Sequence, residues 1–399
     1  MWLINHEKLA EWEIPLLAES GFENIYTPQK YPNIPSYTSG GIVKPRITSS
    51  EIQEDLEELN AQNWYSEISS KSSEIINRHF EVIFVAAELS QIMRIVKSFY
   101  GRIVIRLFGL VGSRSYGELF EFGLSPSELK LFKKNLYRIT FGLGYKELVQ
   151  GEPDWIRNHI IFLPIGVPQT KGIPWVGNSE HVVSVIGRIE PGSYYEKALQ
   201  DHLRIAKNLN IKILGRQHIV FEDPKILGAL NQAEVNTEFS SARCMLYASK
   251  EKKHVHYHPL EAMQIGLPVI YFKNTLLDGI LGGDLEGGVS TETEASGLLL
   301  ELVTNHEKAK LMGLAQQERI SLLERQHLSK DFIDGIKLLT KPLEIRNQEE
   351  WRIGVFCESD HPECINIEYD GKLNSQILLS RDLTKTFISE TKIVTLAFK

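Results

Sequence analysis

The segment 246–271 reads LYASKEKKHVHYHPLEAMQIGLPVIY, and it decides the fold. It predicts a strand, a loop, a helix and a second strand in that order. Pro259 suits the first turn of a helix, where a backbone N–H would stay unpaired in any case, and we expect this helix over 258–265. Gly266 is expected to end the helix, because glycine adopts the left-handed conformation that terminates many helices. The segment therefore predicts a βαβ unit with a parallel sheet.

The same segment predicts a nucleotide-binding site. A helix that begins at the carboxyl edge of a sheet binds phosphate, because its unpaired N–H groups and its dipole favour an anion. We expect Glu261 in the first turn of this helix, where a carboxylate can accept hydrogen bonds from two ribose hydroxyls. His258 is expected to lie at the phosphate.

PLEAMQIGLPVI, which begins at Pro259, resembles the donor-binding signature of GT-B glycosyltransferases, especially those of family 4. The resemblance covers 182–271, is weak over the N-terminal half and is absent from the last residues of the chain. It implies a GT-B fold, a nucleotide-sugar donor, and donor-ribose binding by Glu261.

Two shorter stretches resemble the same family. Val185-Ile186-Gly187-Arg188 is similar to its first C-terminal-domain strand and the Gly-Arg pair that follows, which implies that Gly187 and Arg188 bind the donor, the arginine at phosphate. Leu246-Tyr247-Ala248-Ser249 is similar to the strand before the signature, and Ser249 joins the donor-binding set.

The sequence departs from the family at two positions. Lys253 stands where the family has a glutamate that holds the hydroxyls of a neutral sugar, and an ammonium there would suit a carboxylated sugar. Ser193 stands where the family has a phosphate-binding lysine. One cation fewer favours a monophosphate donor over a diphosphate.

The pair His258-Pro259 resembles a motif of GT-B enzymes with CMP-activated acidic sugars, namely sialyltransferases and bacterial β-Kdo transferases. With His256 in the donor site, the resemblance favours CMP-Kdo as donor and a bacterial surface polysaccharide, such as O-antigen or capsule, as acceptor. We expect a transferase that retains configuration and binds an oligosaccharide or glycolipid. No cofactor or metal is expected, since a helix dipole and basic side chains can stabilise the leaving group.

Three alternatives stay open at this stage. The first is a family-4-like transferase of UDP- or GDP-hexoses, and the second is a non-catalytic GT-B module that binds glycan or scaffolds a larger synthase. The third is a metal site, either on His254, His256 and His258 or as a zinc cluster of Cys357, His361 and Cys364.

The catalytic groups are predicted less specifically. Retention can proceed through same-face substitution or through a covalent intermediate on a carboxylate. The candidate carboxylates in loops of the second domain are Glu222, Asp223 and Glu234. His6 is a candidate base or hydrogen-bonding residue. Arg106 and Arg114 are candidates for acceptor binding, or equally for salt bridges.

Alternating strands and helices predict an α/β chain with two Rossmann-like domains on parallel sheets and a β-rich C-terminal tail. We expect an acceptor domain over 1–170, a donor domain over 171–345, and an extension or further domain over 346–399. The expected strands are 2–5, 82–86, 103–108, 138–141, 160–164, 181–186, 211–214, 243–248, 267–272, 352–356, 365–369, 376–379 and 392–398. The other expected helices are 9–20, 91–100, 195–208, 291–304 and 309–328.

Composition sets the outer limits. The 399 residues are 42% hydrophobic and 24% charged, as in globular proteins, and the net charge of −7 disfavours a nucleic-acid partner. Three cysteines indicate a reducing compartment. We expect a cytoplasmic protein without signal peptide or membrane span, which could lie at the inner membrane or join other domains of a longer synthase.

Overall fold

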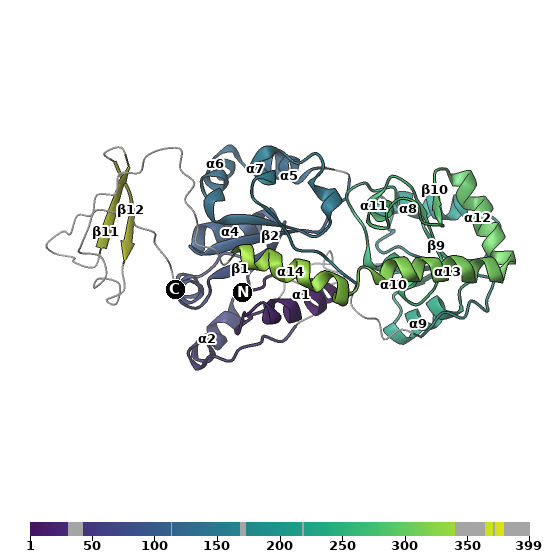
Figure 1. Cartoon of the computed structure of the whole chain (residues 1–399), viewed down its shortest axis with the longest axis horizontal. Helices are drawn as coiled ribbons and strands as arrows, with labels where there is room; N and C mark the ends of the chain where they lie inside the picture. The colour runs from purple at the N-terminus through teal and green to yellow at the C-terminus, as the bar shows by residue number, and fades with distance from the viewer. Residues whose placement is uncertain are drawn as a thin grey trace. The chain divides into compact units, whose positions relative to one another are not determined.

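The computed structural model describes residues 1–30, 43–112, 114–167, 173–217, 219–339, 364–369 and 372–378. The chain divides into two compact units, 1–339 and 340–399 (Figure 1). The described part of the first unit contains two parallel sheets. None of the described helices is long and apolar enough to cross a bilayer.

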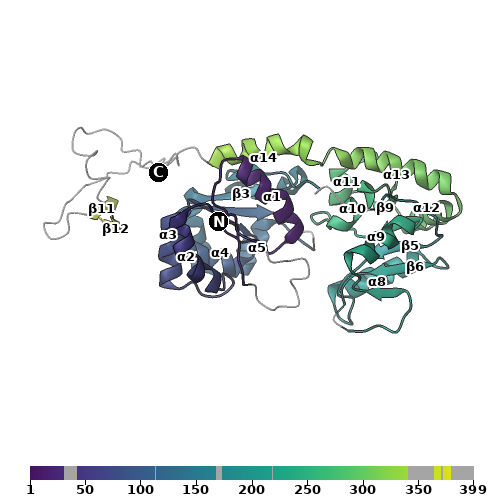
Figure 2. The same cartoon turned by 90° about the horizontal axis from the view of Figure 1, so that it is seen from below.

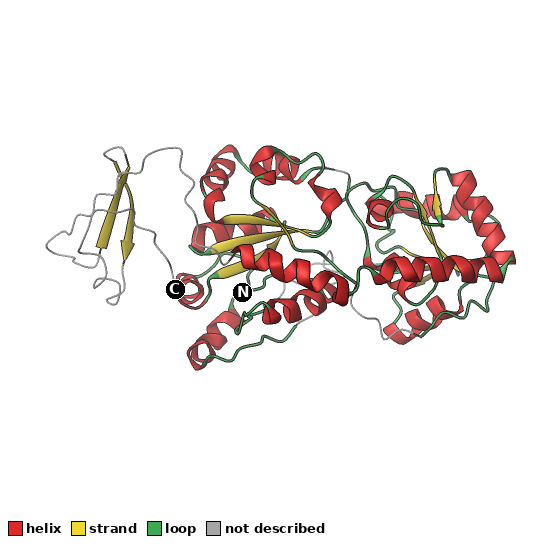
Figure 3. Cartoon of the chain, in the orientation of Figure 1, coloured by secondary structure: helices red, strands yellow, loops and turns green. Residues whose placement is uncertain are grey.

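The first sheet has four parallel strands in sequence order. They are β1 (Val82–Ala86), β2 (Arg102–Leu107), β3 (Ile139–Leu143) and β4 (Ile160–Phe162). Helices lie on both faces of these strands (Figure 3), which explains why the strands are apolar almost throughout. The helices before β4 are α1 (Glu7–Glu19), α2 (Ser50–Ala61), α3 (Ser70–His79), α4 (Leu89–Ser98), α5 (Tyr116–Gly123), α6 (Pro126–Lys134) and α7 (Asp154–Arg157).

The predicted strand over 2–5 is wrong. Trp2 forms only an isolated parallel bridge with Phe84 of β1, and its own N–H donates to Tyr26 O at 2.9 Å. Leu3 N–H donates to Phe84 O at 2.8 Å. The segment still lies beside β1, but too few of its backbone groups pair with that strand to make it one.

The second sheet has the order β10-β9-β8-β5-β6-β7, all parallel. Its strands are β5 (Val182–Val185), β6 (Ile211–Leu214), β7 (Ile226–Gly228), β8 (Cys244–Tyr247), β9 (Val269–Phe272) and β10 (Gly288–Val289). Its helices are α8 (Tyr194–Ile205), α9 (Gln232–Ser241), α10 (Tyr257–Gln264), α11 (Leu276–Ile280), α12 (Glu292–Thr304) and α13 (His306–Ser321). All strands predicted between 82 and 272 are confirmed within two residues.

The single helix predicted over 309–328 is wrong, because the chain breaks it after α13 and begins α14 (Arg325–Leu339). Phe332 and Ile336 of α14 are fully buried in the core of the first sheet, and α14 runs beside α1 (Figure 2). A Cβ on Gly335 would lie 2.2 Å from Phe162 O, so only glycine permits this approach. Residues 325–339 thus pack with the first sheet.

The second unit contains one described hairpin. Antiparallel strands β11 (Cys364–Tyr369) and β12 (Lys372–Leu378) correspond to the strands predicted over 365–369 and 376–379, the second of which begins earlier than expected. The strands predicted over 352–356 and 392–398 lie outside the described residues, as do Cys357 and His361 of the possible zinc cluster.

A buried ion pair connects the elements of the first sheet. Glu13 of α1 accepts hydrogen bonds from Arg106 Nε at 2.7 Å and from Trp2 Nε1 at 2.8 Å. The remaining donors of Arg106 on β2 reach Gly142 O of β3 and Leu163 O after β4. Both charged side chains are completely buried. The expectation that Arg106 binds an acceptor is therefore wrong, since its guanidinium has no exposed surface and every nitrogen has a protein partner.

We predict that Arg106→Met destabilises the protein by about 3–5 kcal/mol, because it removes the cation paired with the buried Glu13 carboxylate and leaves Trp2 Nε1 as its neutral donor. Urea unfolding measures the loss. The control is Arg157→Met, which removes an exposed ion pair with Asp154 and should cost less than about 1 kcal/mol. Equal stability losses in the two variants would contradict the role given to the buried pair.

Candidate functional site

The second sheet reverses its direction of winding between β5 and β8. The chain continues from β5 to β6 and β7 on one side, and from β8 to β9 and β10 on the other. In open parallel sheets such a reversal leaves a crevice at the carboxyl ends of the two strands, and ligands bind there. The loops that follow β5 and β8 border this crevice, and they carry most of the predicted donor-binding residues.

The loop after β5 holds Arg188 in an uncommon backbone conformation. Its φ is 60°, in the left-handed region that few non-glycine residues adopt, and its N–H donates to Arg216 O at 3.0 Å. A Cβ on Gly187 would lie 3.2 Å from the same oxygen. Burial raises the pKa of the Tyr195 phenol, and the nearby charge of Arg188 opposes that shift. The loop thus places a cation beside Tyr195 of α8.

The loop after β8 leads into α10, whose N-terminus lacks a side-chain cap. His256 is the N-cap residue and accepts no hydrogen bond from the helix. In contrast, Ser193, Asn231 and Thr291 accept such bonds at the N-termini of α8, α9 and α12. No side chain therefore caps the first N–H groups of α10, and phosphate binding at this helix stays a prediction.

Glu261 lies one turn inside α10, because the helix begins at Tyr257; its predicted place in the first turn is wrong. Burial raises the pKa of its carboxyl group, and the Lys8 ammonium on α1 lies 3.8 Å from Oε1. Its side chain is 27% exposed, so the carboxylate stays accessible to a ligand hydroxyl. Pro259 is buried in the first turn.

Three histidine rings and two tyrosines pack together before and at the start of α10. The ring centroids of His254 and His256 are 4.5 Å apart, and those of His256 and His258 are 5.1 Å apart. Tyr247 Oη lies 3.1 Å from His256 Nδ1, and the Tyr195 ring lies 6.2 Å from the His256 ring. The cluster therefore joins β8, α8 and α10.

These histidines are uncharged near neutral pH. Burial, with a smaller contribution from His254, lowers the pKa of His256 to about 3. Burial also lowers the pKa of His258 well below its ordinary value, and His256 lowers it further. The expected contact of His258 with phosphate is therefore restricted to hydrogen bonding. Arg188 and the helix dipole supply positive potential.

Sequence reasoning missed Tyr195, Tyr247 and His202. His202 Nδ1 donates to Ala198 O at 2.6 Å while its Nε2 accepts from Ala248 N–H at 3.2 Å, which fixes a neutral tautomer. These residues lie on elements that only the sheet brings together. No local pattern marked them, although Tyr247 falls inside the diagnostic stretch.

Lys253 contacts residues that follow β3 of the first sheet. Its Nζ donates to Gln150 O at 2.7 Å and lies 3.4 Å from Glu152 Oε1. Glu152 is itself buried and accepts hydrogen bonds from the N–H groups of Tyr116 and Gly117 at the start of α5. This placement gives Lys253 a protein carboxylate as its partner, where the sequence suggested a sugar carboxylate.

The rest of the loop is also fixed to the first sheet's side. Ser249 Oγ accepts from Glu251 N–H at 3.4 Å, and Glu251 Oε2 accepts from Gly112 N–H at 2.9 Å. Leu110 N–H donates to Lys253 O at 2.7 Å. The segment after β8 therefore spans from the crevice between β5 and β8 to the loop after β2.

The three candidate carboxylates lie shortly before or after β7, at the edge of the second sheet, and two of them form local hydrogen bonds. Glu222 is exposed in the loop between β6 and β7. Asp223 Oδ1 accepts from Lys225 N–H, and Glu234 forms the capping box of α9 with Asn231. The structure does not bring any of them to the start of α10, since β5 and β6 separate β7 from β8. Their catalytic roles stay predictions.

His6 is the N-cap of α1, and its Nδ1 accepts from Leu9 N–H at 3.2 Å. Burial lowers its pKa, so the neutral ring carries its proton on Nε2. In this tautomer His6 offers a hydrogen-bond donor, which favours the hydrogen-bonding role over the base. Its ring lies 5.4 Å from that of Tyr257. Arg114 is exposed in the loop after β2, and its acceptor role stays a prediction.

Among the residues that the structure describes, no group of three or more His, Cys, Asp and Glu side chains is arranged to hold a metal ion. The metal alternative on His254, His256 and His258 is therefore not supported.

Searches with protein-family models and against curated protein sequences give no match. Solved structures do match. Sucrose-phosphate synthase from Thermosynechococcus elongatus has a TM-score of 0.54 at 13% identity, over 85% of this chain and 98% of that one. HepE from Anabaena in complex with UDP has a TM-score of 0.52 at 9% identity, over 84% and 99%. T4 phage BGT in complex with UDP and Mn²⁺ has a TM-score of 0.50 at 12% identity, over 86% and 99%.

The chain has the GT-B fold. At these identities the likeness establishes the fold alone, and the expected relations to family 4 and to β-Kdo transferases stay predictions. The two parallel sheets of the first unit are the two Rossmann-like domains of a GT-B protein.

We predict that His256 makes the protein less stable in mild acid. Below pH 6.5 His256 becomes protonated in the unfolded chain, whereas in the folded protein it stays neutral down to about pH 3. Protons therefore bind preferentially to the unfolded state, and the free energy of unfolding falls as the pH falls. Between pH 6.5 and pH 5 this one residue costs about 1.5 kcal/mol. Urea unfolding measures the loss of stability between pH 6.5 and pH 5. In His256→Gln this loss should be smaller than in the parent protein by that amount, whereas the variant of the exposed His327, His327→Gln, should lose as much stability as the parent protein. Parallel pH profiles for all three proteins would contradict the prediction.

Proposed function

We propose that this protein is a glycosyltransferase whose nucleotide-sugar donor binds in the crevice between β5 and β8. One observation carries the proposal: Arg188 and the uncapped N-terminus of α10 border the same crevice of a GT-B fold. The Tyr195 ring lies 6.2 Å from the His256 ring at the start of α10, and burial raises the pKa of its phenol while the charge of Arg188 opposes that rise. Such a site suits the phosphate of a nucleotide.

The proposed chemistry assigns separate tasks to the crevice residues. Arg188 and the α10 dipole stabilise the negative charge that develops on the leaving phosphate, and His258 can donate a hydrogen bond but no charge. Gly187 lets the chain approach closely, and the Glu261 carboxylate accepts the ribose hydroxyls. We propose no metal for this step, because fixed positive potential is already present at the phosphate.

The identity of the donor is the finer part of the proposal. The His258-Pro259 pair supports CMP-Kdo. Lys253 does not add to that support, because Glu152 and Gln150 already surround its ammonium. A UDP-hexose is the second candidate, since HepE and T4 phage BGT were both solved with UDP. As acceptor we propose an oligosaccharide or glycolipid of a bacterial surface polysaccharide, glycosylated with retention.

We predict that one nucleotide among CMP, UDP and GDP raises the melting temperature. A ligand at 100 times its dissociation constant stabilises the folded state by about 2.7 kcal/mol. Thermal unfolding with each nucleotide measures the shift, and nucleotide release from CMP-Kdo and from UDP- and GDP-hexoses then tests transfer. Stabilisation by none of the three would overturn the proposal. Glycan binding with no nucleotide response would favour a non-catalytic GT-B module.

We further predict that Glu261→Gln abolishes the preference for ribose. The parent protein should bind the ribonucleotide at least tenfold more tightly than its 2′-deoxy counterpart, because hydrogen bonds to a charged group are worth about 1.5–3 kcal/mol. Calorimetric titration of both nucleotides checks this. Glu11→Gln is the matched control, since Glu11 lies 3.4 Å from the same Lys8 but on the exposed face of α1. An unchanged preference in Glu261→Gln would remove Glu261 from the ribose site.

A further inference from the structure

A pocket of about 140 Å³ lies at the carboxyl edge of the first sheet. The residues that line it include Asn5, His6, Tyr65, Glu88, Gln91 and Phe108. Phe108 follows the end of β2, and Glu88 lies two residues beyond β1. The carboxyl edge of a parallel sheet is where such folds bind ligands.

Two side-chain carbonyl groups of this pocket have no hydrogen-bond donor among the described residues. Gln91 is 1% exposed, and its Nε2 lies 3.4 Å from both Leu3 O and Trp64 O, which leaves Oε1 on the other side of the amide. Gln91 Oε1 and Asn5 Oδ1 are both buried and unpaired. A buried acceptor without a donor costs about 1–3 kcal/mol. A ligand that brings hydroxyl groups would supply the missing donors.

The charges of the pocket favour a neutral ligand over an anionic one. None of the described residues that line it is lysine or arginine, and Glu88 contributes a carboxylate. His6 offers its Nε2–H as a hydrogen-bond donor, because Nδ1 already accepts from Leu9. The pocket thus combines acceptors with one neutral donor, which matches a group that both donates and accepts, as a hydroxyl does.

Size and apolar lining favour a single ring. A protein cavity of about 150 Å³ is known to take up benzene, so 140 Å³ has room for one six-membered ring. Tyr65 and Phe108 add aromatic surface to the apolar side chain of Ile4. Apolar walls with a few placed polar groups are typical of small-molecule sites.

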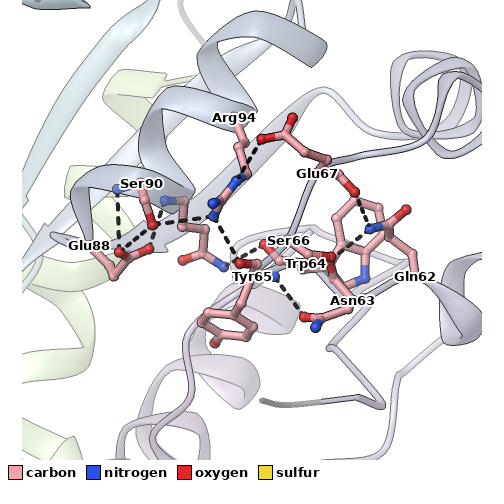
Figure 4. A network of polar contacts seen from close by, with 10 residues as sticks. Gln62, Asn63, Trp64, Tyr65, Ser66, Glu67, Glu88, Ser90 and Arg94 are labelled. Carbon is pink, nitrogen blue, oxygen red and sulfur yellow. Dashed lines mark hydrogen bonds and ion pairs between the residues drawn. The ribbon is translucent and has the colours of Figure 1, made fainter. Parts of the chain in front are cut away.

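Hydrogen bonds hold this wall in place (Figure 4). Arg94 of α4 donates to Tyr65 O at 2.8 Å and to Ser90 Oγ at 3.2 Å, and Ser90 Oγ donates to Glu88 Oε1 at 2.7 Å. Tyr65 N–H donates to Asn63 Oδ1 at 3.0 Å. The segment around Tyr65 is therefore tied to the start of α4, so the pocket is organised before any ligand arrives.

The pocket adjoins the proposed donor site through His6. His6 lines the pocket, and its ring lies 5.4 Å from that of Tyr257, the first residue of α10. The pocket and the start of α10 thus share a boundary at His6 and Tyr257.

The geometry points to this pocket as the subsite for one uncharged pyranose ring of the acceptor glycan, held by Asn5, Gln91 and His6. The inference rests on the proposed glycosyltransferase function. It replaces the cationic acceptor site expected from Arg106, whose guanidinium is buried. It also adds Asn5 and Gln91, which the sequence did not single out, to His6, which it did.

The test measures binding of methyl pyranosides by saturation-transfer NMR and calorimetry on the full chain. The probes are the methyl glycosides of glucose, galactose, mannose and N-acetylglucosamine, with glucuronate as the anionic probe. We expect at least one neutral glycoside to bind and glucuronate to fail. Gln91→Met and Tyr65→Leu should each weaken the binding glycoside at least tenfold, while Glu67→Gln on the exposed side of the same segment should not.

Binding of no neutral glycoside, preferred binding of glucuronate, or equal affinity in Tyr65→Leu and the parent protein would each overturn the inference. Tyr65→Leu keeps the test decisive where Gln91→Met fails to fold. The nucleotide-induced rise in melting temperature serves as the independent readout. A variant that keeps this rise but no longer binds the glycoside shows that the substitution affects the pocket alone. If nucleotide does not raise the melting temperature of the parent protein, the proposed function is contradicted instead.

Discussion

The buried contact between Glu13 and Arg106 is the constraint on which the first sheet depends. It joins α1, β2 and the ends of β3 and β4, and through Trp2 it also fixes the first residues of the chain. A buried ion pair is no guarantee of stability, but it tolerates only a geometry in which every donor is paired. That geometry fixes α1 against the first sheet, and His6 caps the N-terminus of this helix.

The start of α10 also packs against the core of the first sheet. Tyr257, the first residue of α10, contacts this core, and burial raises the pKa of its phenol well above the ordinary value. Lys253 and Glu251, in the loop before α10, bond to Gln150 O and to Gly112 N–H on the first sheet's side. These contacts fix the helix that we propose for the donor phosphate relative to the first sheet.

Sequence reasoning succeeded where the signal is local. The stretch 246–271 carries its own strand, helix start and helix stop, and the glycine after α10 follows from neighbouring residues. The helix begins one residue earlier than predicted, which moves Glu261 out of the first turn. It failed where the partner is remote. The sequence predicts that Arg106 binds the acceptor, but in the fold it pairs with Glu13. It predicts that Lys253 binds a sugar carboxylate, but in the fold its ammonium lies beside Glu152. The hidden acceptors Asn5 and Gln91 carry no charge and match no motif, so no pattern marks them.

The two proposed sites differ in the sign of their charge, and that difference separates their ligands. The donor crevice offers Arg188 and a helix dipole, whereas the pocket beside His6 offers Glu88 and unpaired carbonyl oxygens. A nucleotide phosphate would be repelled from the pocket, and a neutral ring gains nothing from the cation in the crevice. His256 and His258 at the start of α10 are neutral, so they add hydrogen bonds at the crevice without changing its charge. The difference in charge therefore supports the proposal that the donor binds in the crevice and a neutral acceptor ring in the pocket.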